Sequence, residues 1–178
     1  MSAIDDYARD VIESSKWFLQ LANGAADIRQ KQALLRASLL SGFSFLECQV
    51  YQVCDHFAGN SAFEIQERAL ISERAVELKN GRFRLSSRTQ YSRLEDKIEF
   101  LMTRFMADPP YGARPWNSNL SNALKRRNSI AHPKDELILS EADVARDLEA
   151  MIEAASDLFE VIFKKPLPYK AHGLTSKF

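Results

Sequence analysis

Helical periodicity of the apolar residues constrains the fold of this chain more than any other feature of its sequence. Six glycines and six prolines lie mostly in a few short clusters, and long stretches between them contain neither residue. Within those stretches, apolar side chains recur at intervals of three or four residues, which is the spacing of an amphipathic helix. The sequence therefore predicts an all-α protein, folded as a single-domain, up-and-down bundle of five or six helices.

The expected helices span about residues 4–22, 27–57, 61–78, 91–106 and 118–129, followed by a last helix that Ser140 caps and that runs to about residue 162. Ser61 and Glu64 have the spacing of a capping box, and Asn80-Gly81 is expected to end the third helix. Polar and apolar residues alternate over 82–85, which also allows a short strand or extended arm. We expect one helical domain over residues 1–165 and a flexible tail over residues 166–178.

The first two helices contain patterns that predict how they pack. In the first, the apolar stripe consists of Ile4, Tyr7, Val11, Phe18 and Leu21. In the second, the small residues Ser38 and Gly42 lie within the apolar stripe, so a neighbouring helix is expected to approach closely there.

Composition excludes two classes of protein. Of the 178 residues, 46% are hydrophobic and the formal net charge is zero, which is atypical of a disordered chain. The most apolar stretch, residues 34–46, is shorter than a membrane span and contains Arg36. Cys48 and Cys54 lie too far apart on one helix for a disulfide bond, and the acidic N-terminus is unlike a signal peptide. We therefore expect a cytoplasmic protein that does not span a membrane.

The zero net charge conceals two basic windows, residues 78–94 and 109–134, which contain no Asp or Glu. Their basic residues are Lys79, Arg82, Arg84, Arg88, Arg93, Arg114, Lys125, Arg126, Arg127 and Lys134. Aromatic residues are interleaved with them: Phe83, Tyr91, Tyr111 and Trp116. Basic side chains that bind phosphate, combined with aromatic rings that stack on bases, are typical of surfaces that bind single-stranded RNA. Alternatively, the charges form a solvated face, and Phe83 and Trp116 belong to the core.

The most informative stretch is Arg127-Asn128-x-x-x-His132-Pro133. Five residues on a continuous helix would place Arg127 and His132 on different faces, about 140° apart. Pro133 disfavours the helical conformation for the residue before it, so we expect the helix to end before His132. His132 should therefore lie in an extended turn, which the amide of Asn128 can brace.

A helical bundle with this motif ahead of its last long helix resembles the HEPN superfamily (higher eukaryotes and prokaryotes nucleotide-binding domains). Many members of that family are metal-independent endoribonucleases that act as homodimers, as toxins paired with antitoxins or as effectors of antiphage defence. The resemblance implies a stand-alone ribonuclease of the toxin or defence type. HEPN toxins that are modified by a nucleotidyltransferase antitoxin have a tyrosine two residues after the histidine, where this chain has Lys134.

The resemblance implies that Arg127, Asn128 and His132 are catalytic. Histidine exchanges protons near neutral pH and arginine binds phosphate oxygens, so metal and other cofactors are not required. RNA-binding residues are expected to be Arg82, Arg84, Arg88, Arg114, Lys125, Arg126 and Lys134. Glu47, a lone acid in the apolar middle of the second helix, either supports the site by a hydrogen bond to Arg127 or, as is more common for such an acid, faces solvent. On the alternative interpretation, His132 only caps the helix and Arg127 pairs with the acidic last helix. The chain would then be a non-catalytic module that binds RNA or protein, or a structural dimerisation domain.

Overall fold

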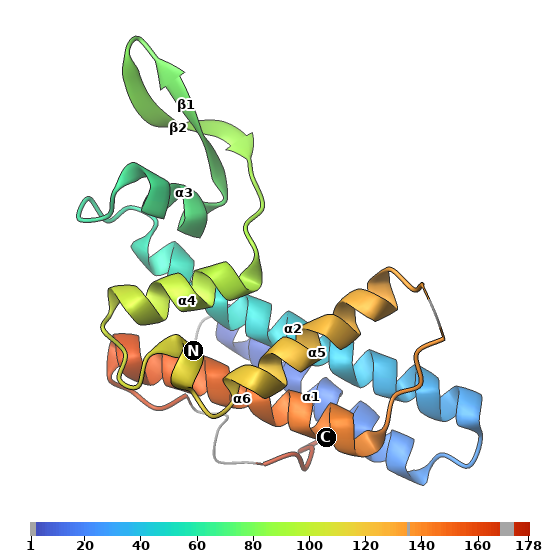
Figure 1. Cartoon of the computed structure of the whole chain (residues 1–178). Coiled ribbons are helices and arrows are strands. Elements are labelled where there is room, and N and C mark those ends of the chain that lie inside the picture. Colours follow the sequence, from blue (N-terminus) through green and yellow to red (C-terminus); the bar gives the residue numbers. More distant parts are fainter. Residues whose placement is uncertain (1–2, 135, 168–172) are drawn as a thin grey trace.

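Helices dominate the computed structural model, which describes residues 3–134, 136–167 and 173–178. Along the chain these residues form α1 (Ala3–Gly24), α2 (Ile28–Phe57), α3 (Ile65–Ser72), β1 (Arg74–Lys79), β2 (Arg82–Thr89), α4 (Leu94–Arg104), the short 3-10 helix η1 (Tyr111–Ala113), α5 (Asn117–Ala131) and α6 (Glu141–Phe163). The predicted all-α bundle is confirmed, with a two-stranded hairpin as its only sheet among the described residues (Figure 1).

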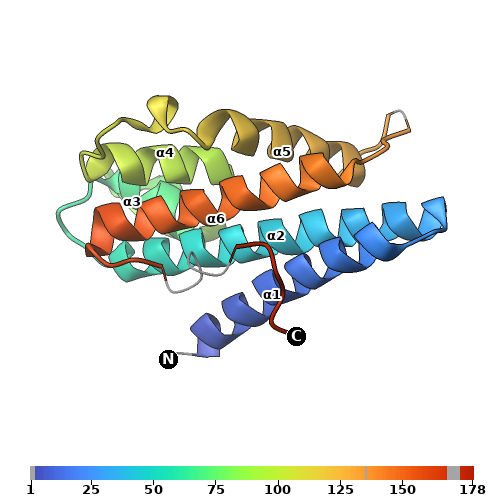
Figure 2. The same cartoon turned by 90° about the horizontal axis from the view of Figure 1, so that it is seen from below.

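Two long helices, α2 and α6, organise the bundle. Helix α1 packs along α2, α6 packs against α2 on another side, and α5 covers α6 (Figure 2). The apolar core lies between these helices and includes Leu39, Phe43 and Leu46 of α2, together with Leu148 and Met151 of α6. Across the described ranges, no helix has both the length and the apolar character needed to cross a membrane.

Close contact at Ser38 and Gly42 was predicted and is confirmed. The hydroxyl groups of Ser15 and Ser38 each donate to the backbone carbonyl of the other residue, at 2.8 Å, which joins α1 to α2. A Cβ atom at Gly42 would overlap the side chain of Leu148 and lie 2.9 Å from the Sδ atom of Met151. Glycine is therefore required at this position because α6 crosses α2 without space for a methyl group.

Replacing Gly42 by alanine is expected to lower the free energy of unfolding by about 1–3 kcal/mol, because the added methyl group overpacks the contact between α2 and α6. Urea denaturation followed by circular dichroism measures the change. Gly24→Ala is the matched control, since a Cβ atom there meets nothing within 4 Å. Equal stability of the two variants would contradict this explanation.

The predicted apolar stripe of α1 is displaced from the stripe that is buried. Ile4, Tyr7 and Leu21 are exposed, whereas the buried face consists of Ala8, Ile12, Glu13, Ser15, Lys16, Leu19 and Ala22. Small residues such as Ala8, Ser15 and Ala22 let α1 lie close to α2, so several large apolar side chains of this helix stay in solvent. The periodicity of the helix was predicted correctly, but the face that packs was not.

The predicted third helix is wrong beyond Ser72. Residues 74–79 form strand β1, which pairs antiparallel with β2. The start of the helix also differs, because Glu64 rather than Ser61 is the N-cap of α3 and forms a capping box with Glu67. Asn80 and Gly81 both have positive φ, at 53° and 72°, and they form the two-residue turn of the hairpin. Asn-Gly is a strong signal for this turn when strands flank it, so the expected helix end at Asn80-Gly81 is wrong. The alternation noted over residues 82–85 belongs to β2.

The C-terminal segment predicted to be flexible is in part held against the bundle. Leu167 is buried, and the backbone N–H of Lys177 donates to the Glu13 carboxylate of α1 at 2.7 Å. The hydroxyl of Ser176 donates to the backbone carbonyl of Glu13. These contacts place residues 173–178 against α1, while residues 168–172 lie outside the described part of the chain. The flexibility of the tail stays a prediction.

Candidate functional site

Helix α5 ends at Ala131, as the position of Pro133 predicted. His132 has φ −133° and ψ 68°, which is outside the helical region, and its backbone N–H donates to the carbonyl of Asn128 at 2.8 Å. The imidazole is exposed and lines a pocket of about 610 Å³ together with Asn128, Ser129, Lys134, Glu136 and Leu137. The backbone of Asn128, rather than its predicted amide, braces the turn.

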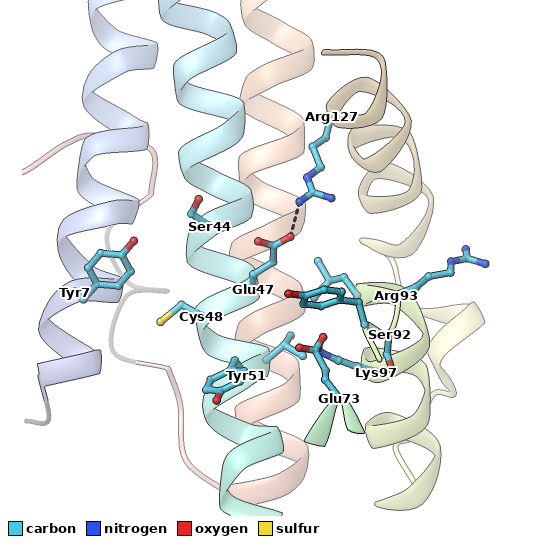
Figure 3. Close-up of a pocket in the computed structure, with 13 residues that line it drawn as sticks. Tyr7, Ser44, Glu47, Cys48, Tyr51, Glu73, Ser92, Arg93, Lys97 and Arg127 are labelled. Atoms are coloured by element: carbon cyan, nitrogen blue, oxygen red, sulfur yellow. Dashed lines mark hydrogen bonds and ion pairs between the residues drawn. The ribbon is translucent and has the colours of Figure 1, made fainter. Parts of the chain in front are cut away.

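Arg127 lies in a second groove, also of about 610 Å³, between α1 and α2 on one side and α4 and α5 on the other (Figure 3). Its Nη2 atom is 2.7 Å from Oε1 of Glu47 on α2, and its guanidinium carbon lies 5.5 Å from the centre of the Phe43 ring. Both members of the ion pair remain more than one-third exposed, with 37% for Arg127 and 43% for Glu47. The groove therefore presents an oriented guanidinium group that solvent can reach.

The structure does not bring Arg127 and His132 into one pocket of a single chain. The two side chains line the two grooves just described. Glu47 contacts Arg127, an arrangement the sequence allowed but did not favour over a solvent-facing acid. The alternative pairing of Arg127 with the last helix is wrong.

The last helix instead binds two arginines that were expected to contact RNA. Both oxygens of Asp147, a fully buried residue of α6, accept hydrogen bonds of 2.7 Å from Arg126, and these bonds raise the pKa of Arg126. Arg114 lies 3.4 Å from Asp157, which also accepts a 2.6 Å hydrogen bond from the indole N–H of Trp116. Arg114 is only 10% exposed, so we assign structural roles to both arginines.

The other basic residues named from the sequence reach solvent. Lys125 and Lys134 are exposed near the end of α5, and Arg82, Arg84 and Arg88 are exposed on β2. The aromatic residues of the two windows divide in the same way. Phe83 and Tyr91 are exposed, whereas Trp116 is buried in the core and Tyr111 packs against its ring.

Aromatic side chains that the sequence did not indicate form walls of the Arg127 groove. Tyr7 of α1, Tyr51 of α2 and Tyr91 before α4 line it and are 58%, 56% and 85% exposed. Leu40, Ser44, Glu47 and Tyr51 follow one another at helical spacing along the exposed face of α2. Tyr7 was assigned to the buried stripe, so its availability became visible only once the packing of α1 was known.

Neither thiol is suited to act as a nucleophile. Cys48 lines the Arg127 groove. The pKa of its thiol is raised mainly by burial, and to a smaller extent by the negative charge of Asp5. Burial raises the pKa of Cys54 to about 11. Both cysteines are free and stay protonated near neutral pH, whereas nucleophilic cysteines have lowered pKa values. No group of three or more His, Cys, Asp or Glu side chains that could hold a metal ion occurs in residues 3–134, 136–167 and 173–178.

Comparison with protein-family models, with curated proteins and with solved structures finds no match for this chain.

Proposed function

We propose that this protein is a metal-independent endoribonuclease whose active site forms between two copies of the chain. The observation that carries the proposal is the position of His132, which is exposed, lies outside the end of α5 and follows Arg127 by five residues. A group that can transfer protons and a group that can bind phosphate thus lie at the same end of α5, and neither side chain is buried in the core. The resemblance to HEPN ribonucleases rests on these same two residues.

The separation of the two side chains supports a homodimer. Because Arg127 and His132 line different grooves of one chain, a second copy is needed to place a histidine from one chain beside an arginine from the other. The exposed aromatic side chains Tyr7 and Tyr51 beside Arg127 are suited to such an interface, since aromatic residues are enriched at protein contacts. A two-fold arrangement would supply two arginines and two histidines to one site.

The proposed reaction uses the 2′-hydroxyl of the RNA as the nucleophile. One His132 accepts the proton of that hydroxyl while its oxygen attacks the adjacent phosphorus. The bond from phosphorus to the 5′-oxygen then breaks, and the second His132 donates a proton to the leaving oxygen. Arg127 binds the non-bridging oxygens, on which negative charge accumulates. The products are a 2′,3′-cyclic phosphate and a 5′-hydroxyl group.

The test is incubation of the purified chain with total RNA in the presence of EDTA, followed by analysis of the new RNA ends. We expect cleavage that persists without metal and leaves 2′,3′-cyclic phosphates. Fragments with 5′-phosphate ends, or cleavage that needs a divalent cation, would contradict the mechanism. RNA binding without any cleavage would instead favour a non-catalytic binding module, an alternative that the pairing of Arg127 with Glu47 supports.

Replacing Glu47 by glutamine is expected to strengthen RNA binding by up to about fivefold, because the phosphate no longer competes with a carboxylate for Arg127. Fluorescence anisotropy with a labelled oligonucleotide measures the change. Glu149→Gln is the matched control, since Glu149 is exposed on α6. Weaker binding by the Glu47 variant would show that Glu47 mainly holds Arg127 in position.

A further inference from the structure

The β-hairpin has two chemically different faces. Opposite residues of an antiparallel pair lie on the same face, so Leu78 and Phe83 share one face, while Lys79 and Arg82 share the other. At the outer end of the hairpin, the apolar face is open to solvent, since Leu78 and Phe83 are 65% and 66% exposed. Figure 1 shows that this end projects well beyond the helices.

The hairpin is also strongly basic. Its strands contain Arg74, Lys79, Arg82, Arg84 and Arg88, against a single acid, Glu77. Because the whole chain has zero net charge, the remainder is acidic. The positive potential is therefore concentrated on an arm that stands away from the acidic bundle, where a polyanion meets little repulsion.

The base of this arm is fixed and adjoins the Arg127 groove. The carbonyl of Glu73 accepts a hydrogen bond of 2.8 Å from the backbone N–H of Gln90, and the Glu73 carboxylate lies 2.6 Å from Nζ of Lys97 on α4. Glu73, Lys97 and residues 91–94 line the same groove as Arg127 (Figure 3). Tyr91 and Arg93, which follow β2 in the chain, thus line the groove next to the base of the hairpin.

We propose that the hairpin is an arm that binds single-stranded RNA and directs it towards the Arg127 groove. A base stacks on the ring of Phe83, and Arg82 and Arg84 bind phosphates. Neighbouring strands are only about 4.8 Å apart, so an arginine side chain on the charged face is long enough to reach past the edge of the ribbon to a backbone on the other side. Arg84, whose Nη2 atom lies 3.5 Å from the carbonyl oxygen of Lys79, exchanges this weak contact for a phosphate. The inference that the RNA is directed towards Arg127 rests on the proposed function, whereas the inference that RNA binds at the hairpin does not.

The exposed aromatic ring favours a single strand over a duplex. Stacking on Phe83 requires a base whose face is free, and bases in a duplex are already stacked on their neighbours. The major groove of A-form RNA is also too deep and narrow for side chains to read. A protein partner would fit the apolar face, but it would leave the excess of arginine on the opposite face unexplained.

The first test measures affinity by fluorescence anisotropy, using the full-length His132→Ala chain so that the RNA remains intact. The probe is a labelled oligouridine of about 12 nucleotides. We expect Phe83→Leu to weaken binding at least about fivefold, because leucine retains the apolar contact but not the stacking surface. Phe83→Tyr should bind like the unsubstituted phenylalanine. Phe178→Ala is the control, because Phe178 is 67% exposed but lies at the C-terminus.

The second test measures the salt dependence of binding. Each phosphate contact to a single strand contributes about 0.7 to the slope of log affinity against log salt, so Arg82→Gln with Arg84→Gln should reduce the slope by about 1.4. Arg29→Gln, an exposed arginine of α2, should leave it unchanged. Circular dichroism confirms that each variant is folded.

Three results would overturn the hairpin proposal: equal affinity of the Phe83→Leu and Phe178→Ala chains, equal or tighter binding of double-stranded RNA, and loss of a dimer in Phe83→Leu. The last result would identify the apolar face as an interface between protein chains.

RNA cleavage is a separate readout. Binding at the hairpin without cleavage by the wild-type chain would contradict only the ribonuclease, whereas cleavage that is insensitive to every hairpin variant, including in its KM, would contradict only the arm.

Discussion

Replacement of His132 by alanine is expected to slow RNA cleavage at least about 1,000-fold, because the proposed site loses its general base and its general acid together. Initial rates on a labelled RNA in EDTA measure the loss. His56→Ala is the matched control, since His56 is also exposed but contacts only the rings of Phe57 and Phe163 in the contacts described. Undiminished cleavage by the His132 variant would remove the basis of the proposed mechanism.

Mixing the two chains then tests whether the site is shared. If one site needs His132 from both copies, refolding equal amounts of wild-type and His132→Ala chains should leave about one quarter of the wild-type rate, because only wild-type pairs are active. If each chain cuts alone, about one half should remain. The second result would contradict a composite site while leaving a role for His132.

Replacement of Glu13 by alanine is expected to lower the free energy of unfolding by about 3–5 kcal/mol, because it leaves a buried ammonium group without its counter-ion. Nζ of Lys16 lies 2.9 Å from Oε1 of Glu13, and the two side chains are 0% and 6% exposed. Glu149→Ala, at an exposed position, should change stability by less than about 0.5 kcal/mol. Chemical denaturation measures both.

The double variant Glu13→Leu with Lys16→Met separates charge from packing. Replacing both members of a buried pair with apolar residues of similar size is often neutral or stabilising, so we expect most of the lost stability to return. If the double variant is as unstable as Glu13→Ala, the loss comes from packing or from the contact with Lys177 rather than from an unpaired charge.

The same pair predicts how stability depends on pH. Burial alone would raise the pKa of Glu13, but hydrogen bonds from Lys16 and from the backbone of Lys177 outweigh it and hold the pKa below 4.5. A carboxyl group with a lowered pKa in the folded state contributes stability above its unfolded pKa, and this contribution is lost as the pH falls through the folded value. Wild-type stability should therefore fall below about pH 4.5, and less steeply in Glu13→Gln.

Local signals in the sequence predicted the helices and the end of α5 before His132. Apolar periodicity indicated each of the long helices, and Pro133 indicated the turn at His132, because both depend on residues close together in the chain. The hairpin was missed although Asn80-Gly81 is a local signal. Leu78 continued a helical pattern from α3, and choosing between helix and strand required knowing that residues 74–79 pair with β2.

The sequence by itself determined the fold class, the uneven distribution of charge and the position of His132 beyond a helix end. Only the tertiary structure decided which guanidinium groups are available to a ligand. Arg114 and Arg126 form ion pairs with carboxylates of α6, whereas Arg127 pairs with Glu47 of α2 and lines a groove. The three arginines lie in one basic window, but their partners lie 43, 21 and 80 residues away. Packing of the helices sets these pairings, so no local pattern reveals them.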